Sequence, residues 1–216
     1  MNPTLLDHVA LWVTGRDVIS DFATAYLGMH VIERTDRFTL IGADARRGKL
    51  TLFEADGPRD PGALARIGLR VSDLDAARAA LPDGTPETFD VGEGLMLTLV
   101  EAETEVDYDL DHVVLRSRDP NAAAREWLRY GFTAAGPRRA EVGGAYLELL
   151  EGDPGETERP LLNHLGVLVD RAAPAQELGV EVADVVDAPN TFAVFVWGPD
   201  RVKLEYVEHK ASFSLR

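Results

Sequence analysis

The sequence contains no cysteine among its 216 residues. This absence excludes a disulfide framework, a thiolate metal site and a cysteine nucleophile, so any bound metal must be held by histidine, aspartate or glutamate. No stretch reaches the length of about eighteen apolar residues that a membrane span needs, and the first residues lack the basic start and apolar run of a secretory signal. We therefore expect a cytoplasmic protein.

Basic residues are also scarce. The chain has 22 lysines and arginines against 37 aspartates and glutamates, which gives a formal net charge of -15. A nucleic-acid backbone or an anionic membrane surface would repel such a protein, so we expect neither as a partner. Hydrophobic residues make up 45% of the sequence, enough for the core of one or two domains. Small molecules and other proteins remain as partners.

The sequence repeats itself. Residues 7–13 (DHVALWV) recur 104 positions later as residues 111–117 (DHVVLRS), and residues 67–71 (IGLRV) are matched by residues 165–169 (LGVLV). A helical stretch follows each of these four strand-like segments, over residues 17–27, 73–81, 121–130 and 172–178. The pattern predicts a duplicated chain built from four βαβββ-like modules.

The predicted fold class is therefore α+β, with two homologous domains. The acidic stretch 101–107 lacks helical or strand periodicity, which is typical of a linker. We expect one domain over residues 1–103 and a second over residues 109–210.

Four polar residues share one face of the predicted strands in the second domain. Side chains in a strand alternate between its two faces, and the apolar residues of these strands mark the face packed on the helices. His112, His164, Glu148 and Glu205 fall on the opposite face. If the sheet curls into a cup, they could converge inside it.

Two imidazoles and one carboxylate form a known type of metal site. The 2-His-1-carboxylate set leaves coordination positions of a divalent metal open, and these positions accept substrate oxygens or water. Either Glu148 or Glu205 could complete such a set with His112 and His164. His8, His30 and His209 are interpreted as structural residues.

The sequence resembles the vicinal oxygen chelate superfamily, which includes glyoxalase I, methylmalonyl-CoA epimerase, fosfomycin and bleomycin resistance proteins and extradiol dioxygenases. The resemblance covers nearly the whole chain and is carried by residues 111–115 (DHVVL), 163–169 (NHLGVLV) and 198–206 (GPDRVKLEY). It implies paired βαβββ modules that form two glyoxalase-like half-barrel domains, with a metal in the second domain bound by His112, His164 and Glu205. Superfamily members often dimerise, so a homodimer is a possible assembly.

In the first domain, the positions that answer the three expected ligands hold His8, Arg66 and Thr98, and we expect no metal there. A duplicated chain with a degenerate first half resembles the two-domain extradiol, ring-cleaving dioxygenases, and Fe(II) is the preferred metal on this interpretation. Ala145 and Phe195 depart from that pattern, because extradiol enzymes have a histidine and a tyrosine at these places for handling protons.

Two other functions stay open. In glyoxalase I and related epimerases, the strand that residues 145–149 resemble supplies a fourth ligand that stands near the moving proton, so Glu148 could make the protein an isomerase on Ni, Co, Zn or Mn. A third possibility is a metal-free protein that sequesters a ligand, as bleomycin-resistance members do. The side chains expected to line the substrate pocket are Tyr146, Phe195, Trp197 and Arg116.

Overall fold

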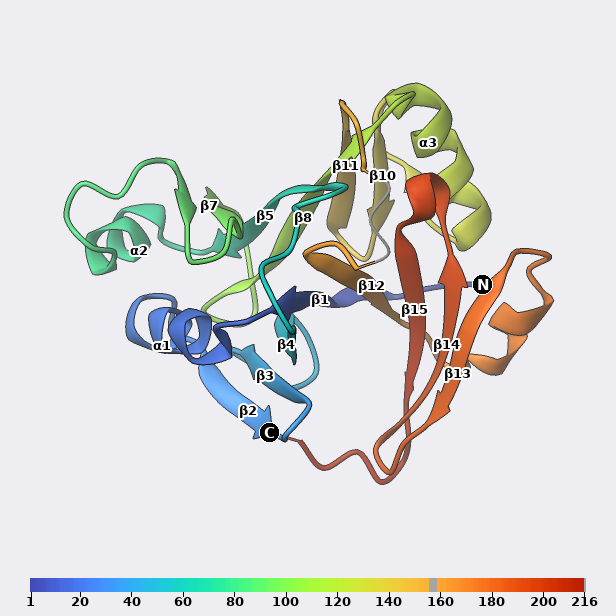
Figure 1. Ribbon diagram of the computed structural model, residues 1–216, viewed down its shortest axis with the longest axis horizontal. Helices are drawn as coiled ribbons and strands as arrows, with labels where there is room; N and C mark the ends of the chain where they lie inside the picture. Colours follow the sequence, from blue (N-terminus) through green and yellow to red (C-terminus); the bar gives the residue numbers. More distant parts are fainter. Residues whose placement is uncertain (156–158, 216) are drawn as a thin grey trace.

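The computed structural model describes residues 1–155 and 159–215. Its strands form one eight-stranded and one seven-stranded sheet, with few helices beside them. Figure 1 shows strands from both ends of the chain, in blue and in red, on either side of β1 and β12. The predicted α+β class and the two half-barrel sheets are confirmed.

The first two modules follow the predicted pattern of a strand, a helix and further strands. The first consists of β1 (Leu5–Val13), α1 (Arg16–Tyr26), β2 (His30–Arg34), β3 (Phe38–Gly42) and β4 (Lys49–Glu54). The second consists of β5 (Leu64–Val71), α2 (Leu74–Ala80), β6 (Thr88–Asp90) and β7 (Met96–Glu101). Asp73 caps α2 by accepting a hydrogen bond from the backbone N–H of Ala76 at 2.9 Å.

The third module repeats this order, whereas the fourth has no α-helix within residues 162–209, all of which are described. The third consists of β8 (Asp109–Ser117), α3 (Pro120–Trp127), the 3-10 helix η1 (Leu128–Tyr130), β9 (Thr133–Ala134), β10 (Arg139–Val142) and β11 (Ala145–Glu151). The fourth consists of β12 (Leu162–Leu168), the 3-10 helix η2 (Ala173–Glu177), β13 (Val182–Asp187), β14 (Thr191–Trp197), the 3-10 turn η3 (Pro199–Arg201) and β15 (Lys203–His209). Gly179, at φ 69°, ends the fourth helical segment before it is long enough for stable α-helical turns.

The modules pair differently from the expected domain division. In the eight-stranded sheet the strand order is β13-β14-β15-β12-β1-β4-β3-β2, so the first module pairs with the fourth. In the other sheet the order is β6-β7-β5-β8-β11-β10-β9, so the second pairs with the third. Each sheet therefore takes strands from both of the expected domains, 1–103 and 109–210. The strand that carries His112 consequently lies in a different sheet from the strands that carry His164 and Glu205.

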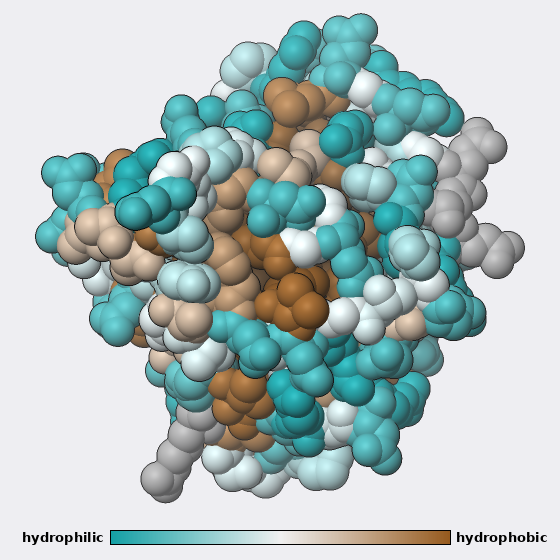
Figure 2. All heavy atoms as spheres, turned by 60° about the vertical axis from the view of Figure 1, so that its left-hand side comes forward, coloured by the Kyte–Doolittle hydropathy of each residue, from teal (hydrophilic) through white to brown (hydrophobic). Residues whose placement is uncertain are grey.

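One hydrophobic core spans both sheets. The fully buried ring of Tyr206 on β15 donates a hydrogen bond from its hydroxyl to the backbone oxygen of Tyr130 at 2.8 Å, which ties the first sheet to the end of the third module. On the face drawn in Figure 2, hydrophobic side chains gather in a central band with hydrophilic ones around it. None of the described helices combines the length and the apolar character needed to cross a bilayer.

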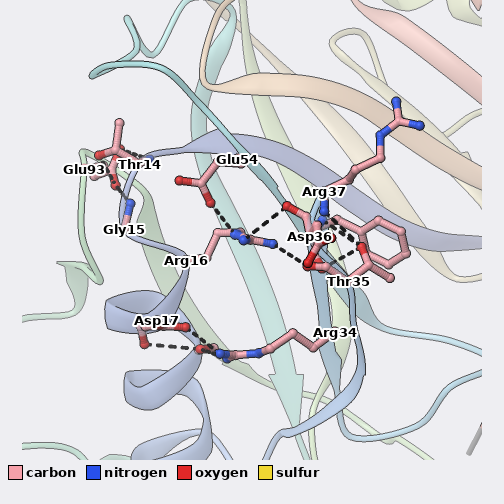
Figure 3. Close-up of polar contacts among 12 residues, drawn as sticks. Thr14, Gly15, Arg16, Asp17, Arg34, Thr35, Asp36, Arg37, Glu54 and Glu93 are labelled. Carbon is pink, nitrogen blue, oxygen red and sulfur yellow. Dashed lines mark hydrogen bonds and ion pairs between the residues drawn. The ribbon is translucent and has the colours of Figure 1, made fainter.

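The start of α1 is capped from another module. Gly15 precedes the helix and has no side chain to accept a hydrogen bond from the first turn. Glu93, from the loop before β7, accepts hydrogen bonds from the backbone N–H groups of Thr14, at 2.9 Å, and Gly15. Figure 3 shows this carboxylate reaching the helix start, where it also complements the helix dipole.

A second set of contacts holds the strand ends beside α1. The Arg16 guanidinium pairs with Glu54 at the end of β4 and donates to the backbone oxygen of Thr35 at 3.0 Å (Figure 3). Thr35 lies in the turn between β2 and β3. These contacts hold the turn between β2 and β3 and the end of β4 beside the start of α1. Trp12 and Phe53 lie at the neighbouring ends of β1 and β4.

Removing the Glu93 cap should destabilise the fold. We expect Glu93→Ala to lower the free energy of unfolding by about 1 kcal/mol, since it deletes a helix cap and a charge at the positive end of the helix dipole. Urea denaturation checks this. Glu87→Ala removes an exposed acidic side chain from the same module and should change the free energy by less than about 0.5 kcal/mol. Equal effects of the two substitutions would contradict the capping role.

Candidate metal centre

Three polar side chains from three adjacent strands meet on the inner face of the eight-stranded sheet. They are His8 on β1, His164 on β12 and Glu205 on β15. The two Nε2 atoms lie 3.0 Å apart, and the Glu205 Oε2 lies 2.8 Å from that of His8 and 2.9 Å from that of His164. The three residues are only 8%, 4% and 7% exposed, so their polar atoms interact with one another in place of bulk water.

Strand register brings these side chains together. Gly166, on β12, pairs with His8 on one side and with Glu205 on the other, and His164 is two residues away on the same face. A Cβ atom at Gly166 would lie 2.2 Å from the His8 ring. The absence of a side chain at this position therefore provides the space that the imidazole occupies.

The outer nitrogen of each imidazole is held by a neighbouring acceptor. The His8 Nδ1 lies 2.7 Å from Oδ2 of Asp7, and the His164 Nδ1 lies 3.0 Å from Oδ1 of Asn163. These contacts assign the ring protons to Nδ1 and direct the Nε2 lone pairs towards the centre of the cluster. Asp7 is in turn held by the buried ammonium of Lys49, whose Nζ donates to Oδ1 at 2.8 Å.

The charges of the cluster are strongly coupled. Burial lowers the pKa of His8, but the facing carboxylates of Glu205 and Asp7 raise it by more, to about 9. Burial alone would raise the pKa of Glu205, yet the two imidazoles hold it well below its usual value. For His164 burial prevails and lowers the pKa. At neutral pH the cluster thus holds an ionised carboxylate and a neutral His164.

The cluster has the donor set and spacing of a metal site. When both imidazoles are neutral, as metal binding requires, two lone pairs and a carboxylate face one another, and a cation between them satisfies all three. Ligand atoms about 2.1 Å from an ion lie about 3.0 Å apart at right angles and about 3.4 Å apart in a tetrahedron. The measured separations of 2.8 to 3.0 Å fit three adjacent corners of an octahedron. His8, His164 and Glu205 therefore fit a divalent cation.

No fourth acidic ligand joins this cluster within the described part of the chain. Thr51 on β4 pairs with Ala10 of β1, and in the other sheet the position with the same register, opposite Val114, is Glu148. The eight-stranded sheet thus carries a threonine where the seven-stranded sheet carries a carboxylate.

The seven-stranded sheet contains a related but altered set of residues. His112 packs over Gly68 as His8 packs over Gly166, and it contacts Asp111 through Nδ1 at 2.7 Å. The register places Arg66 where the first sheet has His164. The guanidinium of Arg66 lies 3.9 Å from Glu148, so an arginine supplies the positive charge in this sheet.

The structure brings a different histidine beside His164 and Glu205 from the one that the sequence predicted. The structure groups His164 and Glu205 with His8, which sequence reasoning had interpreted as structural, and puts His112 in the other sheet. Glu148 and Tyr146 lie beside His112 and not beside the cluster, with Tyr146 stacked on the His112 ring at 5.0 Å. The repeat identified His8 and His112 as equivalent, but it did not show which of them faces His164.

Arg116, expected to line the substrate pocket, also lies in the seven-stranded sheet. It extends along β8 and donates to the backbone oxygens of Gly62, at 3.1 Å, and Leu64. These bonds give it a structural role at the junction of two strands.

Phe195 and Trp197 do lie on the same face as the cluster. The Phe195 ring meets His164 edge-on at 5.1 Å. Sequence reasoning missed two further rings, Trp12 and Phe53, which contact each other at 5.4 Å, with Phe53 6.1 Å from His164. Trp12 lies four residues after His8 on β1, and the two-residue period that puts both on one face was the signal that could have identified it; Phe53 pairs with Trp12 across β1 and β4.

A cavity of about 610 Å³ opens at this end of the sheet. Leu162 and Lys203 line it, each two residues before a ligand on the same strand and therefore on the same face. Asn163 also lines the cavity, so the residue that orients His164 is within reach of a bound molecule. Trp12 and Trp197 provide aromatic walls.

The fold and this cluster define a duplicated βαβββ protein with a buried three-ligand centre. The family model described as "Glyoxalase/Bleomycin resistance protein/Dioxygenase superfamily" matches residues 5–173, and the chain belongs to this superfamily. Among curated proteins none matches the sequence.

Several solved structures share the fold at low sequence identity. A "putative dioxygenase" from Bacillus subtilis subsp. subtilis str. 168 is 16% identical over 98% of this chain and 87% of that one, with a TM-score of 0.79. Glyoxalase I from Zea mays is 17% identical over 96% and 92%, with a TM-score of 0.72. The cppA protein from Streptococcus pneumoniae TIGR4 is 16% identical over 96% and 99%, with a TM-score of 0.63.

Metal loading distinguishes the two histidine assignments. We expect His8→Ala to lose stoichiometric Zn(II) or Fe(II) after gel filtration, because two remaining ligands hold an ion much more weakly. His112→Ala is the matched control, since it removes the equivalent histidine of the other sheet, and it should retain the metal. Elemental analysis gives the result. Loss of metal in His112→Ala and retention in His8→Ala would contradict the assignment.

Proposed function

We propose that the protein is a metal-dependent enzyme that uses His8, His164 and Glu205 to hold Fe(II) and cleaves an aromatic ring with dioxygen. The main support is the buried cluster of two histidines and one glutamate, to which the described residues add no second carboxylate ligand. Three protein ligands on one side of an ion leave positions for two substrate oxygens and for dioxygen, and this set is typical of non-haem Fe(II) oxygenases. When bound, the ion would supply Lewis acidity and one-electron chemistry.

The residues around the cluster support this function in distinct ways. Asp7 and Asn163 fix the orientation of the two imidazoles, and such partners of ligating histidines strengthen metal binding. Phe53 and Phe195 cover His164 with apolar rings, which exclude water and provide flat surfaces for an aromatic substrate. Because Phe195 cannot exchange protons, the substrate proton must leave through a polar group elsewhere on this face.

The isomerase alternative has less support. That interpretation required Glu148 beside the metal as ligand and base, but Glu148 lies in the seven-stranded sheet and contacts Arg66 and Arg139. The corresponding position next to the cluster is Thr51, whose hydroxyl is a poor base at neutral pH. A metal-free binding protein has less support, because a proton on His8 balances Glu205 but leaves the Nε2 lone pair of His164 facing the carboxylate. The cytoplasmic location and the homodimer remain predictions from the sequence.

Oxygen consumption tests the proposed function. Protein reconstituted with Fe(II) without oxygen, mixed with a catechol and then exposed to air, should consume one dioxygen per ring cleaved, since both oxygen atoms enter the product. An oxygen electrode and the absorbance of the product follow the reaction. We expect His164→Ala to lower the rate by at least about 100-fold, the upper end of the loss that follows from disturbing the surroundings of a metal ligand.

Glu148→Gln is the control variant, because the proposed reaction does not use this residue and should proceed at an unchanged rate. Proton exchange at a substrate carbon without oxygen uptake, abolished by Glu148→Gln, would instead establish the isomerase. A protein that retains no stoichiometric metal would refute both enzymatic functions.

A further inference from the structure

Lys203 stands out among the lysines of this acidic chain. The sequence contains three lysines, and the other two are ion-paired, Lys49 with Asp7 at 2.8 Å and Lys210 with Asp187. No carboxylate within the described ranges, 1–155 and 159–215, lies within 4 Å of the Lys203 ammonium. The Lys203 Nζ lies 5.0 Å from the centroid of the Trp197 ring, and the aromatic face attracts the ammonium.

The ammonium is also partly withdrawn from water. Lys203 is half-buried and lines the cavity beside the cluster. A half-buried cation without a carboxylate partner is costly, because the attraction to an aromatic face replaces only part of its hydration. Asp184 acts on it electrostatically but from beyond ion-pair distance. The surroundings of the Lys203 ammonium therefore lack one negative charge at ion-pair distance.

The position of Lys203 relative to the proposed metal is set by strand geometry. It lies two residues before Glu205 on β15, on the same face, so the two Cα atoms are separated by about 6.7 Å. That spacing is comparable to the length of a benzene ring with a substituent. Across β14 and β15, Trp197 pairs with Lys203 and Phe195 pairs with Glu205, so an aromatic ring lies beside each of the two positions.

The other cations that line the cavity already have partners. Arg201 lies 2.8 Å from Glu181, and Arg118 lies 3.0 Å from Asp153. The turn before Lys203 is also fixed, because Asp200 and Arg201 adopt left-handed φ values of 52° and 58°. Such strained backbone is found where the surrounding structure holds a functional position in place.

We propose that Lys203 binds the carboxylate of the substrate, so that the enzyme takes an aromatic compound with chelating oxygens at one end and a carboxylate at the other. The inference rests on the proposed function for the chelating end only. In this arrangement the metal holds one end of the ring, the tryptophans contact its faces, and the ammonium pairs with the far end. Neutral catechols are then poorer ligands than carboxylated ones.

Binding of two probes tests the proposal. We expect Zn(II)-loaded protein, titrated calorimetrically under nitrogen, to bind 3,4-dihydroxybenzoate about tenfold more tightly than catechol, the gain of one partly buried charge-assisted hydrogen bond. Lys203→Met should reduce this preference to within about twofold while leaving the catechol affinity and the metal content unchanged. Lys203→Arg, which keeps the charge, should restore most of the preference.

Lys210→Met is the matched control, since it makes the same substitution in the same sheet on a lysine that already has a partner. It should keep the full preference for the carboxylated probe. Because the folded state must be intact, thermal unfolding is measured for each variant, and Lys203→Gln provides a second neutral replacement. Equal binding of the two probes to the wild type, or an undiminished preference in both neutral variants, would overturn the proposal. Failure of both probes to bind would do the same.

Oxygen uptake separates this inference from the proposed function. A protein that discriminates the probes through Lys203 but consumes no oxygen with Fe(II) keeps the carboxylate site and loses the dioxygenase function. A protein that cleaves both probes with equal kcat/KM keeps the dioxygenase function and loses the role of Lys203.

Discussion

The antiparallel pairing of β1 with β12 is the contact on which the candidate metal centre depends. It pairs His8 with Gly166, two residues from His164, although His8 and His164 are separated by 156 positions in the chain. The whole seven-stranded sheet is built from the segment between these two residues. Long-range pairing of this kind is slow to form and costs loop-closure entropy. The extensive core shared by both sheets offsets that cost.

Buried charge is the second constraint on the site. A continuous chain of polar contacts runs through the interior and joins Lys49, Asp7, His8, Glu205, His164 and Asn163. A proton on His8 can balance Glu205, since the pKa of this histidine is raised to about 9. A divalent cation balances the same carboxylate and also satisfies both Nε2 lone pairs, which one proton cannot do. The network is therefore best satisfied with a metal bound.

The sequence is sufficient to predict the modules but not their partners. Alternation along each strand put His164 and Glu205 on one face, where the structure also has them, because the two-residue period depends only on local geometry. It could not decide between His8 and His112, which have nearly identical surroundings in the sequence. Four related modules can pair as neighbours in the chain, the first with the second and the third with the fourth. They can also pair the first with the fourth and the second with the third, and only the strand register distinguishes these arrangements. The assumption that neighbours pair also misplaced Glu148.

The two sheets share one scaffold, but one carries residues that fit a metal ion and the other carries an arginine as its cation. At equivalent register the eight-stranded sheet has His164, and the seven-stranded sheet has Arg66, whose guanidinium already faces Glu148. An arginine is a permanent cation fixed to the chain, whereas a metal ion held by His8, His164 and Glu205 would leave coordination positions for a substrate. Glu148 in the seven-stranded sheet has its cation in Arg66, and Glu205 in the eight-stranded sheet would have it in the proposed metal ion. Only where the cation is exchangeable can a substrate enter the coordination sphere, and that confines the proposed chemistry to the sheet formed by the two ends of the chain.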